Sequence, residues 1–547
     1  MGQPVALARP GLSRLSSRLP LALAALLPLG FLAVFFVWPV AAIIRLGLGR
    51  GSIWPVLSTS DTWGLVGFTV GQAAASTVLA VLAGLPVAYL LARCRLPGLW
   101  LVRVVVLVPF VLPTVVVGLA FRALFGDTGV LAIVLANAFF NVAVVARTVA
   151  GLWTHLDRRA EQAAATLGAS PVRVFLTVVL PGLRPALASA AAVVFLFCAT
   201  SFGVVLILGG ARHRTLETEI YLRTVELLDL PGAAALSLLQ LVAVLAALTV
   251  GAVARRRRES ALRLRGLRQQ PRRPAGLGLV AACAGLGVVA ALLVPVVVLV
   301  LRSLSTSGGW GLDGFRALAG RGLPGTLAVS GVDAVLNSLR AATDATLIAL
   351  LLGGVAAVVL VSLGRSAVRP ALVETVDAAF MLPLGVSAVT VGFGYLVTLD
   401  ALPGDLRTSA LLVPLAQALV VTPLVVRILL PVLRSIDPRQ RQAAAVLGAS
   451  PVRVWWEVDA RLAGRSVLTA TAFGYVVALG EFGATSFLAR PETITLPVAI
   501  GRLISRPGAL NTQMAYAACV VLVVLTVAAV ALIEAVRAPG GAPVGEF

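Results

Sequence analysis

Side chains able to perform covalent or metal chemistry are scarce in this chain of 547 residues. It contains two histidines, His155 and His213, and four widely separated cysteines. Because metal sites and disulfide frameworks need clustered cysteine and histidine residues, we interpret the cysteines as small apolar side chains. The phosphate-binding pattern GxxxxGK(S/T) is missing as well. The sequence therefore predicts no catalytic residue, no metal site and no nucleotide or other cofactor bound by this chain.

Five polar residues lie inside long apolar stretches, where lipid makes a polar group costly and a functional role common. They are Asn137, Asn141, Ser201, Gln417 and Glu481. Asn141 follows Asn137 by one helical turn, so both lie on one face of a helix. One interpretation is that the five residues line a solute pathway; the other is that they form hydrogen bonds between helices. Glu481 either faces water, where it would attract a cation, or pairs with an arginine.

The stretches around these residues have the composition of a membrane protein. Hydrophobic residues make up 59% of the chain and charged residues 12%, whereas about 25% of the residues in a typical soluble domain are charged. Runs of about 20 apolar residues without alternation indicate transmembrane helices. We predict an all-α integral membrane protein with twelve spans. The predicted spans are 20–44, 65–92, 101–126, 129–153, 186–210, 232–254, 277–301, 335–363, 371–397, 409–433, 465–489 and 514–536.

Arginines between the predicted spans indicate the orientation. The short loops near Arg95 and Arg173 are rich in arginine, which places them in the cytoplasm under the positive-inside rule. The first apolar run, 19–44, exceeds the roughly 7–15 residues of a signal-peptide core. We interpret it as the first span and expect the N-terminus in the cytoplasm. The net charge of +21 thus reflects membrane orientation, and no nucleic-acid partner is expected.

The chain contains an internal repeat. Residues 162–174 read QAAATLGASPVRV and residues 442–454 read QAAAVLGASPVRV, so twelve of thirteen positions are identical at an offset of 280 residues. The repeat predicts two parallel six-helix halves, 1–254 and 275–547, joined by an arginine-rich cytoplasmic linker at 255–274. The same offset pairs Asn137 with Gln417, Arg147 with Arg427, Asp157 with Asp437, Ser201 with Glu481, and Phe202-Gly203 with Phe482-Gly483.

The repeated segment predicts two short helices joined by a tight turn. Residues 162–167 are good helix formers, and Gly168 suits the left-handed position that ends a helix. Ser170 is a strong N-cap, and Pro171 fits the first position of the next helix. A rigid pair of helices can transmit a displacement, whereas a flexible loop cannot. The second copy has Gly448, Ser450 and Pro451 at the same places.

This pattern resembles the permeases of binding-protein-dependent ABC importers, whose loop begins Glu-Ala-Ala, has a glycine four residues after the second alanine, and carries Leu-Pro further on. Here the loop has Gln162-Ala163-Ala164, Gly168 and Leu180-Pro181. The resemblance implies a type I importer fold, in which the loops at 155–185 and 435–465 each form a coupling helix seated in a groove of an ATPase. The implied coupling residues are Gln162, Ala163, Ala164, Gly168, Ser170, Pro171, Arg173, Gln442, Ala443, Ala444, Gly448, Ser450, Pro451 and Arg453.

The loops depart from the family pattern in two ways. Gln162 and Gln442 replace the usual glutamate, which puts an ion pair from that position to the ATPase in doubt. Glu161 lies one place earlier in the first loop, and Arg441 takes its place in the second. Ala460-Arg461 lies where the first loop has Leu-Pro. We therefore expect the loops to differ where they rejoin the membrane.

The resemblance also implies partners and a location. Two copies of a cytoplasmic cassette ATPase would carry out ATP hydrolysis, with ATP and Mg²⁺ bound on those subunits. An extracytoplasmic solute-binding protein would deliver the solute, and membrane lipid would surround the chain. The implied location is the bacterial inner (cytoplasmic) membrane, which the chain crosses many times. The chain itself is not expected to be an enzyme.

The sequence indicates the transported solute less directly than it indicates the class of transporter. The fused two-half arrangement resembles thiamine and ferric-iron permeases, whereas residues 480–485, GEFGAT, also resemble molybdate and sulfate permeases. We expect thiamine or ferric iron, with a molybdate, sulfate or polyamine permease as the alternative. A twelve-span secondary transporter is a further alternative, but it would not require its closest internal match to lie in a cytoplasmic loop. An integral membrane enzyme would need a cluster of His, Cys and Asp residues.

Overall fold

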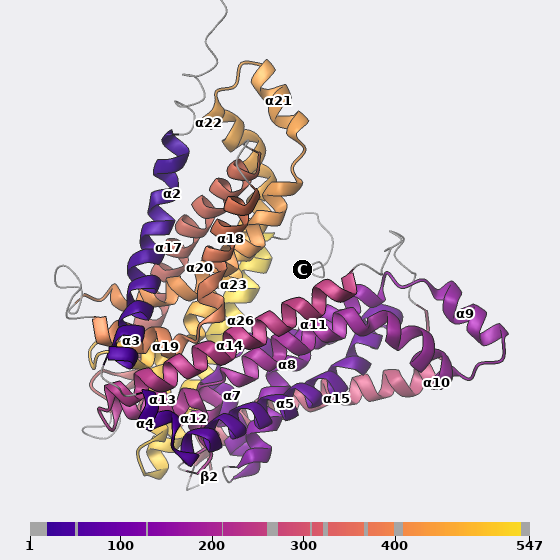
Figure 1. Ribbon diagram of the computed structural model, residues 1–547. Coiled ribbons are helices and arrows are strands. Elements are labelled where there is room, and N and C mark those ends of the chain that lie inside the picture. Colours follow the sequence, from indigo (N-terminus) through magenta and orange to yellow (C-terminus); the bar gives the residue numbers. More distant parts are fainter. Residues whose placement is uncertain are drawn as a thin grey trace, which may run out of the picture. The chain divides into compact units, whose positions relative to one another are not determined.

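The computed structural model is built almost entirely of helices (Figure 1). Within the described residues, the strands form a single small hairpin of β1 (Ser305–Thr306) and β2 (Gly309–Trp310). The predicted all-α membrane fold is confirmed. Most of the predicted linker, 260–271, lies outside the described residues. The structure describes residues 19–49, 53–126, 129–210, 212–259, 272–306, 309–320, 327–365, 370–398 and 409–537.

Ten continuous helical stretches in the described chain are long and apolar enough to cross a membrane, and two bent helix pairs bring the total to as many as twelve. This agrees with the predicted number of spans. The single-helix spans are α5 (Ser60–Arg93), α8 (Val130–Trp153), α14 (Leu230–Glu259), α15 (Leu277–Leu304), α17 (Gly331–Arg365), α20 (Leu412–Ser435) and α26 (Ala509–Arg537). The composite spans are α2 (Leu19–Leu32) with η1 (Ala33–Val37) and α3 (Trp38–Gly49), α10 (Pro171–Val174) with η2 (Phe175–Val179) and α11 (Leu180–Ala199), and α22 (Pro451–Val454) with η5 (Trp455–Ala460) and α23 (Arg461–Gly480).

Two predicted straight spans are bent. The stretch predicted at 101–126 bends by 102° between α6 (Leu99–Val111) and α7 (Thr114–Phe125). The break falls at Pro113, which lacks a backbone N–H and disfavours helical geometry at the residue before it; that residue is indeed extended, with ψ of 136°. The stretch predicted at 371–397 bends by 93° between α18 (Pro370–Gly385) and α19 (Ala388–Thr398).

The spans that follow the repeated loops begin earlier than predicted. They run over Pro171–Ala199 and Val452–Gly480, instead of 186–210 and 465–489. Each passes through a π-helical turn, η2 or η5. Such turns accommodate an irregularity in the ladder of backbone hydrogen bonds while the helix continues. The second short helix of each loop is therefore one end of a helical stretch long enough to span a membrane.

The chain forms two compact units that do not follow the order of the sequence. One unit takes its described residues from Met1–Ala42, Leu339–Leu479 and Val527–Phe547. The other takes its described residues from Ile43–Ser338 and Gly480–Thr526. Each unit therefore contains segments of both predicted halves. The predicted boundaries follow the repeat rather than the packing, and they stay a prediction.

Shorter helices connect the spans. They are α4 (Ile53–Leu57), α9 (Arg158–Thr166), α12 (Gly203–Leu208), α13 (Leu216–Val225), α16 (Asp313–Ala319), α21 (Pro438–Val446), α24 (Thr485–Leu488) and α25 (Leu496–Ile504).

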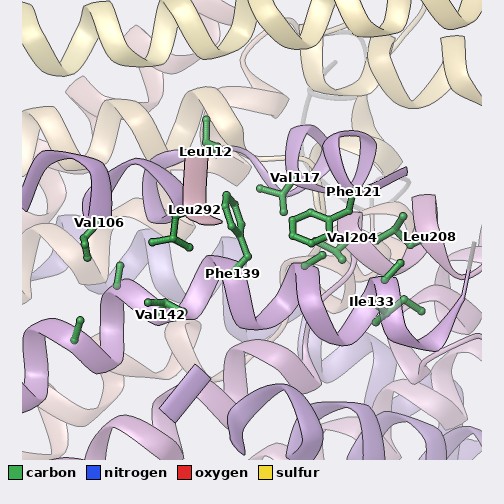
Figure 2. Packing of buried hydrophobic residues seen from close by; sticks show 14 of the residues in the cluster. Val106, Leu112, Val117, Phe121, Ile133, Phe139, Val142, Val204, Leu208 and Leu292 are labelled. Atoms are coloured by element: carbon green, nitrogen blue, oxygen red, sulfur yellow. The ribbon is translucent and has the colours of Figure 1, made fainter. Parts of the chain in front are cut away.

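A buried apolar cluster joins six helices of the larger unit, the one that contains Ile43–Ser338 and Gly480–Thr526 (Figure 2). Phe121 of α7 meets Phe139 of α8 edge to face, with 5.4 Å between ring centroids. Lipid is as apolar as these side chains, so the hydrophobic effect does not drive the helices together within the membrane. Close packing of the side chains holds them together instead. The labelled members of the cluster come from α6, α7, α8, α12 and α15, and from Leu112 directly after α6: Val106, Leu112, Val117, Phe121, Ile133, Phe139, Val142, Val204, Leu208 and Leu292.

The same close helix crossing occurs in both units. A Cβ added to Gly84 of α5 would lie 2.7 Å from the Cβ of Val145 in α8. A Cβ added to Gly353 of α17 would lie 2.8 Å from the Cβ of Val425 in α20. Val145 and Val425 are related by the repeat offset. Glycine therefore allows two membrane helices to approach closely at equivalent crossings.

We expect Gly353→Ala to destabilise the protein by about 1–3 kcal/mol, because the added methyl group forces α17 and α20 apart. Gly354→Ala is the matched control, since a Cβ at Gly354 would meet nothing within 4 Å. The measurement is the midpoint of thermal unfolding of the detergent-purified protein. Equal midpoints for the two variants would contradict the close crossing.

Candidate coupling loops and intramembrane polar residues

The first repeated loop has the predicted helix–turn–helix geometry. Asp157 is the N-cap of its helix α9, and the Asp157 carboxylate accepts a hydrogen bond from Arg159 N at 2.9 Å. Gly168 has φ of +83°, a conformation that glycine adopts without steric cost. Ser170 then caps α10 by accepting from Arg173 N at 3.4 Å. Figure 1 shows α9 and α10 as a hairpin that projects beyond α8 and α11.

The second loop repeats this geometry in the other unit. Asp437 caps α21 by accepting from Arg439 N at 2.9 Å. Gly448 has φ of +82°, and the Ser450 hydroxyl accepts from Arg453 N at 3.4 Å. The predicted turn and cap residues therefore lie where the sequence indicated in both copies.

Large apolar side chains are exposed at the tips of both loops. Leu167 and its repeat equivalent Leu447 are 87% and 88% exposed, and Val446 beside the latter is equally exposed. Gln162 and Arg173 also lie on the surface. Exposed apolar groups gathered on a rigid projection are typical of a protein contact surface. The motif did not reveal the two leucines, although their place directly before the turn glycine could have indicated them.

The base of each loop is held by an ion pair that sequence reasoning missed. In the first loop, Arg93 Nη2 lies 2.7 Å from Glu161 Oε1. In the second, Arg441 Nε lies 2.7 Å from Asp459 Oδ1. The signal was present in the sequence, because Glu161 and Arg441 are opposite charges at one repeat position.

The structure brings three of the predicted pathway residues into one buried network. Asn137 donates to Gln72 Oε1 at 3.0 Å, and Ser201 donates to Asn137 Oδ1 at 2.8 Å. Asn141 donates to the Asn137 carbonyl oxygen at 2.8 Å. Gln72 also donates to the Cys198 carbonyl oxygen at 2.7 Å, so the network joins α5, α8 and α11. These partners favour the interpretation that the residues hold helices together.

Glu481 adopts an arrangement that the sequence analysis did not consider. Its carboxylate accepts hydrogen bonds from Ala484 N at 2.8 Å, from Thr485 N at 3.0 Å and from the Thr485 hydroxyl. It thereby caps α24, where a helix N-terminus favours negative charge. In the described chain no arginine pairs with it.

Gln417 does not share the hydrogen bonds of its repeat equivalent Asn137. It lies buried in α20, in the other compact unit, and among the described residues its Oε1 has no hydrogen-bond partner. The corresponding Asn137 side chain of the first half donates to Gln72 and accepts from Ser201. The repeat therefore preserves a polar position here without preserving its partners.

An aromatic cluster joins the two sequence halves within the larger unit. Phe202 and Phe482, related by the repeat offset, stack with centroids 5.3 Å apart and planes inclined by 18°. Tyr221 lies 5.2 Å from Phe202 and 5.3 Å from Phe487, measured between ring centroids. Burial raises the pKa of the Tyr221 phenol. The repeated Phe-Gly pair was visible in the sequence, but its direct contact was not.

The charged helix α13 is largely buried. Most of its residues are buried, and it packs against α14. Glu217 accepts a hydrogen bond from Gln240 of α14. Arg223 Nε lies 3.0 Å from Glu219 Oε1, so paired charges permit the burial.

Known proteins are similar to this chain in sequence. Residues 80–259 match the family described as "Binding-protein-dependent transport system inner membrane component". The molybdenum transport system permease protein ModB of Mycobacterium tuberculosis is 37% identical over 240 residues, which cover 40% of this chain and 89% of the relative. The thiamine transport system permease protein ThiP of Brucella abortus is 27% identical over 530 residues, 91% of this chain and 93% of the relative. The sulfate transport system permease protein CysT of Escherichia coli is 30% identical over 228 residues, 38% of this chain and 82% of the relative.

The likeness to a thiamine permease over nearly the whole chain agrees with the predicted fusion of two halves in one polypeptide. The many apolar helices agree with a multi-pass membrane protein. The chain belongs to the family of inner-membrane components of binding-protein-dependent transport systems, and it is an ABC importer permease of the fused two-half type.

Proposed function

We propose that the two repeated loops are the docking sites of a cytoplasmic cassette ATPase, and that the chain passes a small solute from an external binding protein into the cytoplasm. The observation that carries this proposal is the pair of glycine-turned hairpins with exposed tips, Leu167 and Leu447. Both hairpins have the same turn, the same caps and an exposed leucine directly before the turn glycine. Two equivalent projections suit two copies of one partner. ATP and Mg²⁺ would be held by those partner subunits.

The continuity of each hairpin with a membrane helix provides the mechanical link. The helical stretches Pro171–Ala199 and Val452–Gly480 begin in the loops and extend through the bilayer. A push on α9 or α21 is therefore delivered to a helix that reaches the membrane interior. ATP-driven closure of the partner subunits would tilt these helices and alternate access to the solute pathway.

The comparisons support thiamine as the first solute to test. The thiamine permeases match 91% of this chain, including both halves. Ferric iron rests on the fused arrangement alone. Molybdate is the principal alternative, because the molybdenum permeases reach higher identity over 240 residues, and the likeness to a sulfate permease extends this alternative to sulfate.

Uptake by cells of the source organism distinguishes these solutes. We expect deletion of the gene to abolish saturable uptake of labelled thiamine, and expression of the intact chain to restore it. Labelled ferric iron, molybdate and sulfate are measured in the same cells. Loss of molybdate or sulfate uptake with normal thiamine uptake would contradict the thiamine proposal and support the alternative.

Replacing the turn glycines tests the docking proposal. In Gly168→Val/Gly448→Val we expect the hairpins to distort, because the left-handed conformation costs about 1–2 kcal/mol for a residue with a Cβ. The cassette ATPase that co-purifies with the wild-type chain from native membranes is identified by mass spectrometry and recognised by the phosphate-loop motif in its sequence. We expect this ATPase no longer to co-purify with the valine variant. Gly168→Asn/Gly448→Asn is the matched control, since asparagine tolerates this conformation. Undiminished ATPase binding and transport in the valine variant would contradict the docking role.

Glu481→Gln tests whether the buried carboxylate contacts solute. Because the Glu481 carboxylate caps α24, we expect the variant to retain uptake with an unchanged KM and to lose about 1 kcal/mol of stability. Glu481→Ala, which removes both acceptor oxygens, should lower the unfolding midpoint further. Loss of uptake in Glu481→Gln, at normal expression and midpoint, would instead support the pathway role predicted for this residue.

A further inference from the structure

A buried ion pair ties the first coupling loop to a transmembrane helix that is distant in the sequence. Arg93 is the last residue of α5, and Glu161 lies in α9. Their side chains are 4% and 28% exposed, with 2.7 Å between Nη2 and Oε1. The same Nη2 lies 3.4 Å from the Leu156 carbonyl oxygen, whereas Nε and Nη1 are buried without a hydrogen-bond partner among the described residues. Glu161 is therefore the carboxylate that balances this buried charge.

The second loop reverses the charge at the equivalent position and uses a different partner. Arg441 occupies the place of Glu161, and Asp459 of η5 occupies the place of Val179. Arg441 Nε lies 2.7 Å from Asp459 Oδ1 and 3.0 Å from Oδ2. Both side chains are at least four-fifths buried. This ion pair therefore joins α21 of the second loop to η5, which belongs to the membrane helix that follows the loop.

The helix that corresponds to α5 is α17, and within the described residues its last residue forms no direct ion pair with a carboxylate of the second loop. Arg365, the last residue of α17, donates to the Leu433 carbonyl oxygen at 3.2 Å. Arg441 Nη2 lies 3.5 Å from the same oxygen. The end of α17 therefore contacts the end of α20, while the ion pair of the second loop is formed without it.

We propose that the pairs Arg93–Glu161 and Arg441–Asp459 are positioning residues that connect the two coupling loops to different membrane helices. This inference rests on the proposed docking of an ATPase at the loops. Movement of α9 is delivered both to the helix that follows it and, through Arg93, to α5. Movement of α21 is delivered through Asp459 to the helix that follows it and, through the contact of Arg441 with the Leu433 carbonyl oxygen, to the end of α20.

The chemistry of the pairs suits this role. An arginine–carboxylate contact is strong and directional, and removal of one partner leaves the other charge buried and uncompensated. The α5 helix that Arg93 ends also carries Gln72, the centre of the buried polar network. A displacement of the first loop is thus linked to the helices α8 and α11, which share that network.

The test measures solute transported per ATP hydrolysed by the full complex in proteoliposomes. We expect Glu161→Gln to keep ATPase binding and hydrolysis but to lower this ratio by about five-fold or more. The charge swap Arg93→Glu/Glu161→Arg should restore the ratio to within about two-fold of wild type, because it re-forms an ion pair at the same place. A merely structural role would lower the unfolding midpoint without changing the ratio.

The second loop supplies a matched comparison. We expect Asp459→Asn to lower the ratio of solute transported to ATP hydrolysed. The double variant Arg441→Glu/Asp459→Val gives the second loop the residue types of the first loop at both positions. We expect it to recover the ratio, because the new glutamate can pair with Arg365 as Glu161 pairs with Arg93. An unchanged ratio in both Glu161→Gln and Asp459→Asn would overturn the inference. So would charge-swapped protein that folds at the wild-type midpoint without regaining transport.

The two proposals fail in different ways. If wild-type protein bound no ATPase, the docking proposal would be wrong and the ratio could not be measured. If wild-type complex formed and transported solute while the neutral variants kept the full ratio, docking would stand and the positioning role of the ion pairs would be wrong.

Discussion

The need to satisfy every polar group without water governs the structure of this chain. In lipid an unpaired backbone group is costly, so the chain forms continuous helices wherever it spans. Where the helices break, nearby groups compensate: the Ser387 hydroxyl accepts from Val389 N at the start of α19, and Glu481 caps α24. The amides of Asn137 and Gln72 follow the same rule, since they are partners for each other, whereas Gln417 Oε1 has no partner among the described residues. Polar side chains thus provide hydrogen-bond partners for the backbone N–H groups that are left without partners where a membrane helix breaks.

The fold class and the loops were predictable because their signals are local. Apolar runs mark spans, and glycine, serine and proline at fixed spacing mark the hairpin. The bend at Pro113 was also marked locally, yet a helix with an interior proline and a broken helix have the same composition. Tertiary packing decides between them, and it cannot be read from the run of apolar residues.

The roles of the buried polar residues depended on partners that the sequence could not identify. Glu481 was expected to find an arginine or water, and it found backbone N–H groups three and four residues ahead. The hub of the network, Gln72, lies 65 residues from Asn137, and no spacing rule joins them. The division into compact units was equally hidden, because residues from both repeats enter each unit.

The stack of Phe202 on Phe482 has a consequence for how the two halves can change. In a symmetric dimer of identical half-length chains, a residue at the two-fold axis meets its own copy, so one codon would determine both rings. Fusion into one polypeptide gives each ring its own codon. The neighbouring position shows that freedom in use, since Ser201 joins the polar network while Glu481 caps a helix. The two rings are nevertheless both phenylalanine, so this contact keeps the self-complementary form that a two-fold axis would impose.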